Sequence, residues 1–147
     1  GVKIIINDRV DVALAVAADG VHLGQDDLPP AEARSILGEN AIIGFSTHTI
    51  EQAIRAMNLP IDYIAIGPVF TTDTKLDPDA VIGLEGLREV RNAIGDFPLV
   101  AIGGINDTNQ LSVFAAGADS AAMISALVAD ATVIEQRMKF FLTQMPQ

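Results

Sequence analysis

The chain has no cysteine, and only nine of its 147 residues are lysine or arginine, against nineteen aspartates and glutamates. Without cysteine, disulfides, thiolate metal sites and thiol catalysis are excluded. The net charge of −10 argues against nucleic acid as a general partner. It leaves open the binding of a small anion by one lysine, backbone amides and a metal ion.

Long hydrophobic runs are also missing. No stretch approaches the ~18–20 unbroken apolar residues of a membrane helix, and the nearest candidate, "VFAAGADSAAMISALVAD", contains Gly117 and Asp119. The sequence has no basic segment followed by an apolar stretch, so we expect no secretory signal. We therefore expect a soluble, cytoplasmic protein with no membrane partner. The first residue is Gly1 rather than Met, which suggests that the native start has been removed or replaced.

Half of the residues are hydrophobic, and 147 residues suffice for one domain with its own core, so residues 1–147 are expected to form a single domain. Short apolar runs typical of buried parallel strands alternate with amphipathic segments typical of helices. The predicted strands are Lys3–Ile6, Gly20–Leu23, Ala41–Phe45, Tyr63–Ile66, Leu99–Ile102 and Ala121–Ile124.

Strand and helix patterns repeated about six times predict a parallel α/β fold. An open doubly wound sheet would favour a glycine-rich turn after the first strand, but "NDRVD" has no glycine. A (β/α)₈ TIM barrel needs about 200–250 residues, so six units would leave a gap in its wall and two unpaired strand edges. Because of the loop residues described below, we expect an incomplete TIM barrel.

Local signals refine this pattern. Thr49 and Gln52 form a plausible capping box before the helical stripe that begins at Ile50, and Asp107 could cap the helix that follows the fifth predicted strand. An aspartate also precedes three predicted strands by one or two residues, in "DGVHL", "DYIAI" and "DSAAM". This recurrence supports one repeating structural unit.

Polar residues gather where the predicted strands end, and in a parallel α/β fold these ends meet on the face that binds ligands. Asp8 and Asp27 follow adjacent strands, so their carboxylates should lie close together. Such a pair repels unless a proton or a cation lies between the two groups, and Mg²⁺ favours one or two carboxylates plus substrate phosphates. The alternative is that both residues cap helices, Asp27 before "LPPAEARSILG".

The later loops suggest a phosphate site. In "GPVFTTDTK", Thr72, Thr74 and Lys75 could bring hydroxyls and an ammonium group to an anion, although a solvated loop is equally consistent with this stretch. In "AIGGI", Gly104 offers backbone amides that a ligand can approach closely. Gly104 and Ser125 follow the last two strands, which is where barrels commonly bind phosphate.

The two histidines carry weaker signals. His22 falls inside a predicted strand, where a satisfied wall residue is the more common role, and His48 precedes a helix. No spacing typical of a Ser–His–Asp triad or of a zinc site stands out.

Several motifs together resemble one enzyme family. "IINDRVDVALAVAADGVHLGQDDLP", "IGFSTHT", "YIAIGPVFTTDTK" with "GLEGL", and "VAIGGI" are similar, in order and spacing, to thiamine phosphate synthase from about Val2 to Leu127. The resemblance implies a (β/α)₈ barrel that joins hydroxymethylpyrimidine diphosphate to a thiazole phosphate and releases pyrophosphate in the presence of Mg²⁺. It also implies a dissociative reaction, in which the diphosphate departs before the thiazole nitrogen attacks a pyrimidine-stabilised cation.

The resemblance also implies roles for individual residues. Asp8 and Asp27 would hold magnesium, Asn7 and Ser46 would lie at the pyrimidine, and Lys75 would contact the diphosphate. The thiazole phosphate would be contacted by Thr72, Thr74, Gly104, Ile124 and Ser125. Ser46 and Lys75 are the residues that we expect to act in catalysis.

One departure from the family limits these expectations. Family members begin with two further βα units that carry a Gln-x-Arg-x-Lys motif, and no such motif occurs here. We therefore expect the isolated chain to be inactive, with its open wall covered by a second copy or by rearrangement. Two alternatives remain: a thiazole tautomerase, although Pro68 stands where those enzymes carry a histidine, and a non-catalytic phosphate-binding barrel remnant.

Overall fold

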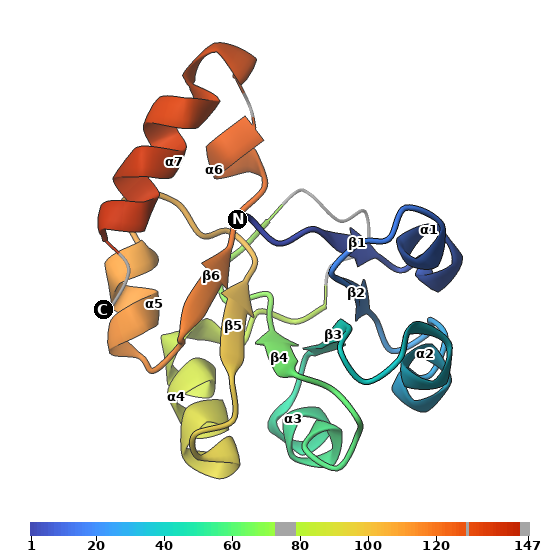
Figure 1. Cartoon of the computed structure of the whole chain (residues 1–147). Coiled ribbons are helices and arrows are strands. Elements are labelled where there is room, and N and C mark those ends of the chain that lie inside the picture. Colours follow the sequence, from blue (N-terminus) through green and yellow to red (C-terminus); the bar gives the residue numbers. More distant parts are fainter. Residues whose placement is uncertain (73–78, 129, 145–147) are drawn as a thin grey trace.

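Six parallel strands form a curved sheet in the computed structural model, which describes residues 1–72, 79–128 and 130–144 (Figure 1). Each strand pairs with the next along the chain, so the spatial order equals the sequence order. The strands are β1 (Ile5–Asn7), β2 (Gly20–Leu23), β3 (Ile42–Thr47), β4 (Tyr63–Ile66), β5 (Leu99–Ile102) and β6 (Ser120–Ala122).

Helices cover the outer side of this curved sheet (Figure 1). They are α1 (Val10–Ala15), α2 (Pro30–Leu37), α3 (Ile50–Ala56), α4 (Gly83–Ile94) and α5 (Gln110–Ala115). A short α6 (Ser125–Val128), a 3₁₀ turn (Ala131–Val133) and α7 (Ile134–Thr143) follow β6 and extend away from the sheet. The predicted incomplete barrel is confirmed, and in the described part of the chain β1 and β6 each pair on one side alone.

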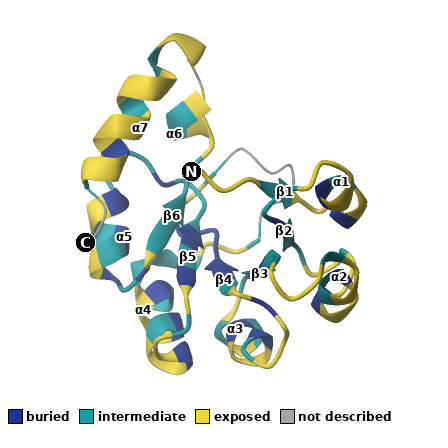
Figure 2. Cartoon of the chain, viewed as in Figure 1, coloured by how far each residue is buried: buried dark blue, intermediate teal, exposed yellow. Residues whose placement is uncertain are grey.

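The core lies between the sheet and its outer helices (Figure 2). Strand residues such as Leu23, Ile43, Ile64 and Leu99 are fully buried, and they meet the inner faces of the helices. Burial of each such side chain contributes about 1.5–3 kcal/mol. Because the outer face of the sheet is covered in this way, the inner face and the strand ends remain available for polar residues.

Most predicted boundaries are correct to within two residues. β3 runs on to Thr47, whose Oγ1 donates a 3.0 Å hydrogen bond to the Ala65 carbonyl on β4. The prediction that Asp107 caps the next helix is wrong, because α5 begins at Gln110 after Asn109. Asn109 instead accepts a 2.8 Å hydrogen bond from the Asn106 backbone N–H, which closes the turn that Asp107 lies in.

The predicted capping box before α3 forms with one change of partner. Thr49 Oγ1 accepts a hydrogen bond from the Gln52 backbone N–H at 3.2 Å, as expected for an N-cap. The Gln52 side chain, however, accepts from the backbone N–H of His48 rather than that of Thr49. The box therefore fixes the backbone of His48 as well as the start of the helix.

The three aspartates that precede strands share one structural role. Each carboxylate accepts a hydrogen bond from the backbone N–H at the start of the preceding strand: Asp19 from Ile4 at 2.9 Å, Asp62 from Ile43 at 2.7 Å and Asp119 from Leu99 at 2.8 Å. Each also binds a basic side chain, namely Lys3, Arg34 or Arg91. The recurrence seen in the sequence is therefore a repeated clamp between neighbouring strands.

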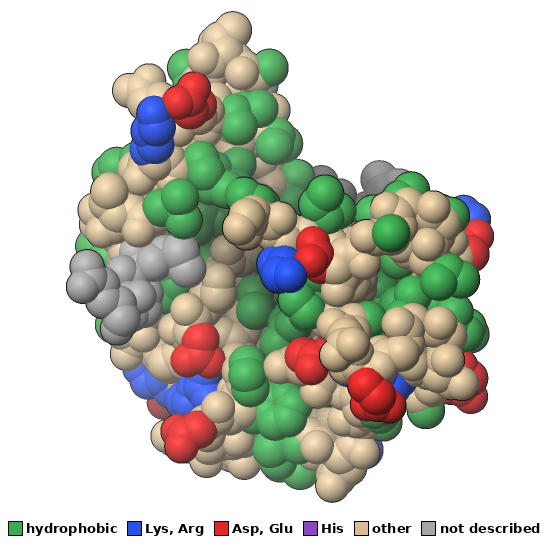
Figure 3. All heavy atoms as spheres, in the orientation of Figure 1, with side chains coloured by type: hydrophobic (Ala, Val, Ile, Leu, Met, Phe, Trp, Pro, Cys, Tyr) green, Lys and Arg blue, Asp and Glu red, His purple; other side chains and the backbone are tan. Residues whose placement is uncertain are grey.

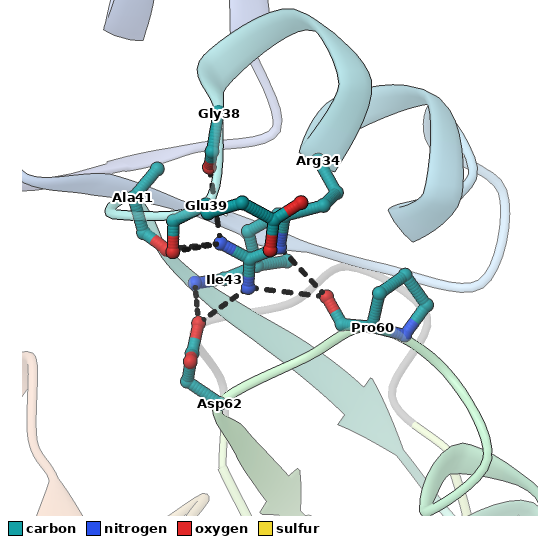
Figure 4. Close-up of polar contacts among 7 residues, drawn as sticks. All are labelled: Arg34, Gly38, Glu39, Ala41, Ile43, Pro60 and Asp62. Atoms are coloured by element: carbon teal, nitrogen blue, oxygen red, sulfur yellow. Dashed lines mark hydrogen bonds and ion pairs between the residues drawn. The ribbon is translucent and has the colours of Figure 1, made fainter.

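Arg34 shows how the clamp reaches further (Figure 4). Besides the carboxylate of Asp62 at 2.8 Å, its guanidinium donates to the carbonyls of Gly38, Ala41 and Pro60. It thereby joins the end of α2 to the starts of β3 and β4. Arg91 repeats the arrangement with Asp119, again 28 residues further along the chain.

Hydrophobic side chains are exposed at both ends of the curved sheet. Val2 and Ile4 lie beside β1, and Figure 3 shows hydrophobic side chains gathered over α6 and α7, where Val128 and Leu142 are more than half exposed. Within the described residues, no helix combines the length and hydrophobicity needed to cross a lipid bilayer.

We predict that Asp62→Ala lowers the free energy of unfolding by about 1–3 kcal/mol, because it leaves the Ile43 N–H and the Arg34 guanidinium without their shared acceptor. Urea denaturation measures this change. Asp96→Ala is the matched control, since Asp96 is an exposed loop carboxylate. Equal effects of the two substitutions would contradict the clamp.

Candidate functional site

A cavity of about 580 Å³ opens at the carboxyl ends of the strands. Its volume is in the range of ~300–1,000 Å³ that is usual for small-molecule sites. Residues from the end of every strand line it, among them Asn7, Gly24, Ser46, Gly67, Gly103 and Ala122. This is the face on which parallel α/β folds bind their ligands.

Asp8 and Asp27 meet in this cavity. Their carboxyl groups lie within hydrogen-bonding reach of each other. Partial burial, the hydrogen bond with Asp27 and the charge of Asp27 all raise the pKa of Asp8, while a hydrogen bond from Asn7 opposes them. The close pair that the sequence predicts is therefore present.

The backbone fixes both carboxylates in place. Asp8 has a φ of 63°, a conformation that aspartate tolerates better than most residues, and its N–H donates to the His22 carbonyl at 2.8 Å. Asp27 Oδ2 accepts a 2.7 Å hydrogen bond from the Gly24 N–H. The alternative that Asp27 caps α2 is not realised, because α2 starts at Pro30 with Pro29 as its N-cap.

The described lining of the cavity is strongly acidic. It contains the four carboxylates Asp8, Asp26, Asp27 and Asp79, and among described residues it contains no lysine or arginine. The described residues also hold no cluster of three or more side chains of the kinds that ligate metals. Two carboxylates fit Mg²⁺, which commonly takes one or two of them and completes its shell with water and substrate phosphates.

Gly103 and Gly104 allow two loops to pack against each other. Their φ angles are 97° and 64°, and a Cβ on Gly103 would lie 2.6 Å from Pro68, while one on Gly104 would lie 2.5 Å from the Thr71 carbonyl oxygen. Both glycines line the cavity. They are therefore needed for the close approach of the loop that follows β4, in addition to any approach of a ligand.

The structure brings most of the predicted site residues to one place. Asn7 ends β1, Ser46 lies on β3, and Thr72 belongs to the loop after β4. Ile124 and Ser125 lie where β6 passes into α6. Both are exposed and line the cavity. Thr74 and Lys75 lie outside the described residues.

Other polar residues line the cavity as well: Gln25 and His48, which belong to the loops expected at this face, and His22 and Asp79, which the sequence did not place there. Gln25 Nε2 donates to the Ser46 carbonyl, and His48 Nδ1 lies 2.7 Å from the Gly67 carbonyl and 3.4 Å from Asp79. Gln25 lies two residues after β2 and His48 directly follows β3, so their position near a strand end was the available signal.

The six consecutive βα units and the cavity at the carboxyl ends of their strands define an incomplete parallel α/β barrel. The family model described as thiamine monophosphate synthase matches residues 1–127. The chain belongs to this family.

Individual relatives agree with this assignment. The chain is 50% identical over 141 residues to thiamine-phosphate synthase from Chloroflexus aurantiacus, covering 95% of this chain and 64% of that one. It is 49% identical to the enzyme of the same name from Methanocella arvoryzae, covering 98% of this chain and 68% of that protein. Among solved structures, thiamine phosphate pyrophosphorylase from Pyrococcus furiosus superposes with a TM-score of 0.82 at 42% identity, over 95% of this chain and 66% of that chain. The chain thus spans roughly 60–70% of the length of these relatives.

Proposed function

We propose that the protein takes part in thiamine biosynthesis as a Mg²⁺-dependent transferase, which joins hydroxymethylpyrimidine diphosphate to thiazole phosphate. The C–O bond between the pyrimidine methylene and the diphosphate breaks, and its electron pair leaves with pyrophosphate. The lone pair of the thiazole nitrogen then forms the new C–N bond. The family assignment supports this reaction.

The observation that carries the proposal is the acidic pair at the mouth of the barrel. Asp8 and Asp27 lie in hydrogen-bonding contact within a cavity that has two further carboxylates. A diphosphate would be repelled from such a lining unless a divalent cation neutralised both partners. Bound Mg²⁺ would supply this charge and stabilise the departing anion.

The side chains of this chain then act chiefly by position and charge. Asn7 and Ser46 would hold the pyrimidine, and Thr72, Gly104 and Ser125 would hold the thiazole phosphate, since all of them line the same cavity. We also propose that Thr74 contacts the thiazole phosphate and that Lys75 contacts the diphosphate, in agreement with the family motif "TTDTK".

We expect Asp27→Asn to reduce synthase activity of the gene product that contains this chain by about 100-fold or more, because a proposed metal ligand is lost. Asp26→Asn is the matched control: it removes the same charge from the neighbouring residue, and its effect should be much smaller. Product formation at a series of Mg²⁺ concentrations measures both. Full turnover in the presence of a chelator would refute the metal site.

Asp8 is expected to be needed for activity, but its raised pKa predicts that its charged form destabilises the metal-free fold. A carboxyl group whose pKa is higher in the folded state favours folding when protonated, and this contribution is lost as the pH rises through the folded-state pKa. Without divalent metal, Asp8→Asn should therefore melt higher than the unsubstituted protein at pH 7, and the difference should shrink toward pH 3. Mg²⁺ should raise the melting temperature of the unsubstituted protein but not that of Asp8→Asn. A lower melting temperature for the variant at pH 7 in chelator would contradict this.

The tautomerase alternative gains no support from residue 68. Pro68 lines the cavity and offers no acid–base group, whereas proton transfer requires one within reach of the substrate. A direct assay separates the two reactions: synthase activity releases pyrophosphate, and tautomerase activity does not. A non-catalytic phosphate-binding barrel would bind thiazole phosphate without Mg²⁺ and release nothing.

We also propose that the 147-residue chain alone does not turn over and that a second copy covers its open wall. The support is the one-sided pairing of β1 and β6 in the described chain, beside the exposed side chains of Val2, Ile4 and Val128. Sedimentation analysis should give a dimer or higher oligomer, and a monomer at micromolar concentration would overturn this. A cytoplasmic location and the absence of nucleic-acid and membrane partners also stay predictions.

A further inference from the structure

The strand register places three residues side by side across the inner face of the sheet. His22 on β2 pairs with Gly44 on β3, and Gly44 pairs with Tyr63 on β4. A Cβ on Gly44 would lie 2.0 Å from the Tyr63 ring and 2.5 Å from His22 Nδ1. Because Gly44 has no side chain, the rings of His22 and Tyr63 can meet beside it. Their centroids are 5.5 Å apart and their planes differ by 25°.

These rings form a hydrogen-bonded chain that ends in the cavity. His22 Nδ1 lies 2.9 Å from Tyr63 Oη, and His22 Nε2 lies 2.8 Å from Ser46 Oγ. Ser46 is two residues beyond Gly44, so it lies on the same face of β3 and one layer closer to the cavity mouth. Its partner in register on β4 is Ala65, which offers no polar side chain.

Protonation decides which way the hydrogen bonds run. Burial lowers the pKa of His22 and raises the pKa of Tyr63, so both the neutral imidazole and the phenol O–H are favoured. A neutral imidazole has one donor nitrogen and one acceptor nitrogen. The phenol is the stronger donor, so it would give its hydrogen to Nδ1, and Nε2–H would then donate to Ser46 Oγ. The hydroxyl hydrogen of Ser46 would be left to point into the cavity.

We infer that His22 is a positioning residue, held by Tyr63, which presents the Ser46 hydroxyl as a hydrogen-bond donor to an acceptor atom of the diphosphate-bearing substrate. Ser46 touches the ligand, while His22 and Tyr63 act through Ser46. This inference rests on the proposed function for the identity of the ligand, but the tautomer of His22 can be tested without it.

The first test is the ¹⁵N NMR spectrum of the protein labelled at histidine, which contains two imidazoles, those of His22 and His48. His22 should show a protonated Nε2 and a bare Nδ1. Tyr63→Phe keeps the ring but removes the hydroxyl, so it should change the tautomer populations of His22 and leave those of His48 unchanged. A proton on Nδ1 in the unsubstituted protein would overturn the inference.

The second test compares two amides at position 22 in the gene product that contains this chain. His22→Gln can place an amide N–H near the position of Nε2 and retain the contact with Ser46, whereas His22→Asn reaches only the position of Nδ1. We expect the asparagine variant to lose about tenfold or more in kcat/KM, which corresponds to the loss of one hydrogen bond to the ligand. The glutamine variant should keep most of the kcat/KM of the unsubstituted protein.

A double-mutant cycle separates this role from a structural one. In a Ser46→Ala background, His22→Asn should cause no further loss in kcat/KM, because the group that it positions is already gone. Equal losses with and without Ser46, at unchanged melting temperature, would refute the inference. If no form of the protein releases pyrophosphate, the proposed function fails, and the ¹⁵N spectrum still decides the state of His22.

Discussion

The parallel hydrogen bonding of six consecutive strands is the constraint on which the rest of this structure depends. Because each strand pairs with its successor, all six carboxyl ends meet at one edge, and residues from distant parts of the sequence line one cavity. The same register fixes which side chains are neighbours within the barrel, as for His22 and Tyr63 on either side of Gly44. The chemistry at the mouth is thus a consequence of strand order, and the individual loops need only supply suitable side chains.

Much of this arrangement could be predicted from sequence because it follows from local periodicity. The apolar runs gave the boundaries of β2, β4 and β5 correctly, and the position of Asp8 and Asp27 after adjacent strands was enough to predict that they meet. His22 was expected to be a satisfied wall residue, but its contacts with Tyr63 and Ser46 could not be predicted, since they depend on the register of three strands and on the gap at Gly44. Asp107 failed as a predicted cap because Asn109, two residues later, closes the turn instead. Loop conformation of this kind is decided by competing side-chain partners that periodicity does not distinguish.

Stability and chemistry are built at opposite ends of the strands. The clamps of Asp62 with Arg34 and of Asp119 with Arg91 join strand starts to helix ends, where the carboxylates are satisfied by backbone N–H groups and guanidinium groups. At the other end, Asp8 and Asp27 have each other as neighbours, so their charge is left largely uncompensated by the described side chains. The fold therefore carries an electrostatic cost at the cavity, which the proposed Mg²⁺ would relieve.

The close packing of Gly103 and Gly104 against the loop after β4 has a mechanical consequence. The backbone N–H of Phe70 donates to the Gly103 carbonyl at 3.0 Å, and that of Val69 donates to the Ile102 carbonyl at 2.9 Å. With no side chains between them, residues 68–71 and the β5 loop pack backbone against backbone. A displacement of the β5 loop would therefore also move residues 68–71. Under the proposed reaction, such coupling would favour an ordered arrival of the two substrates over independent, random binding.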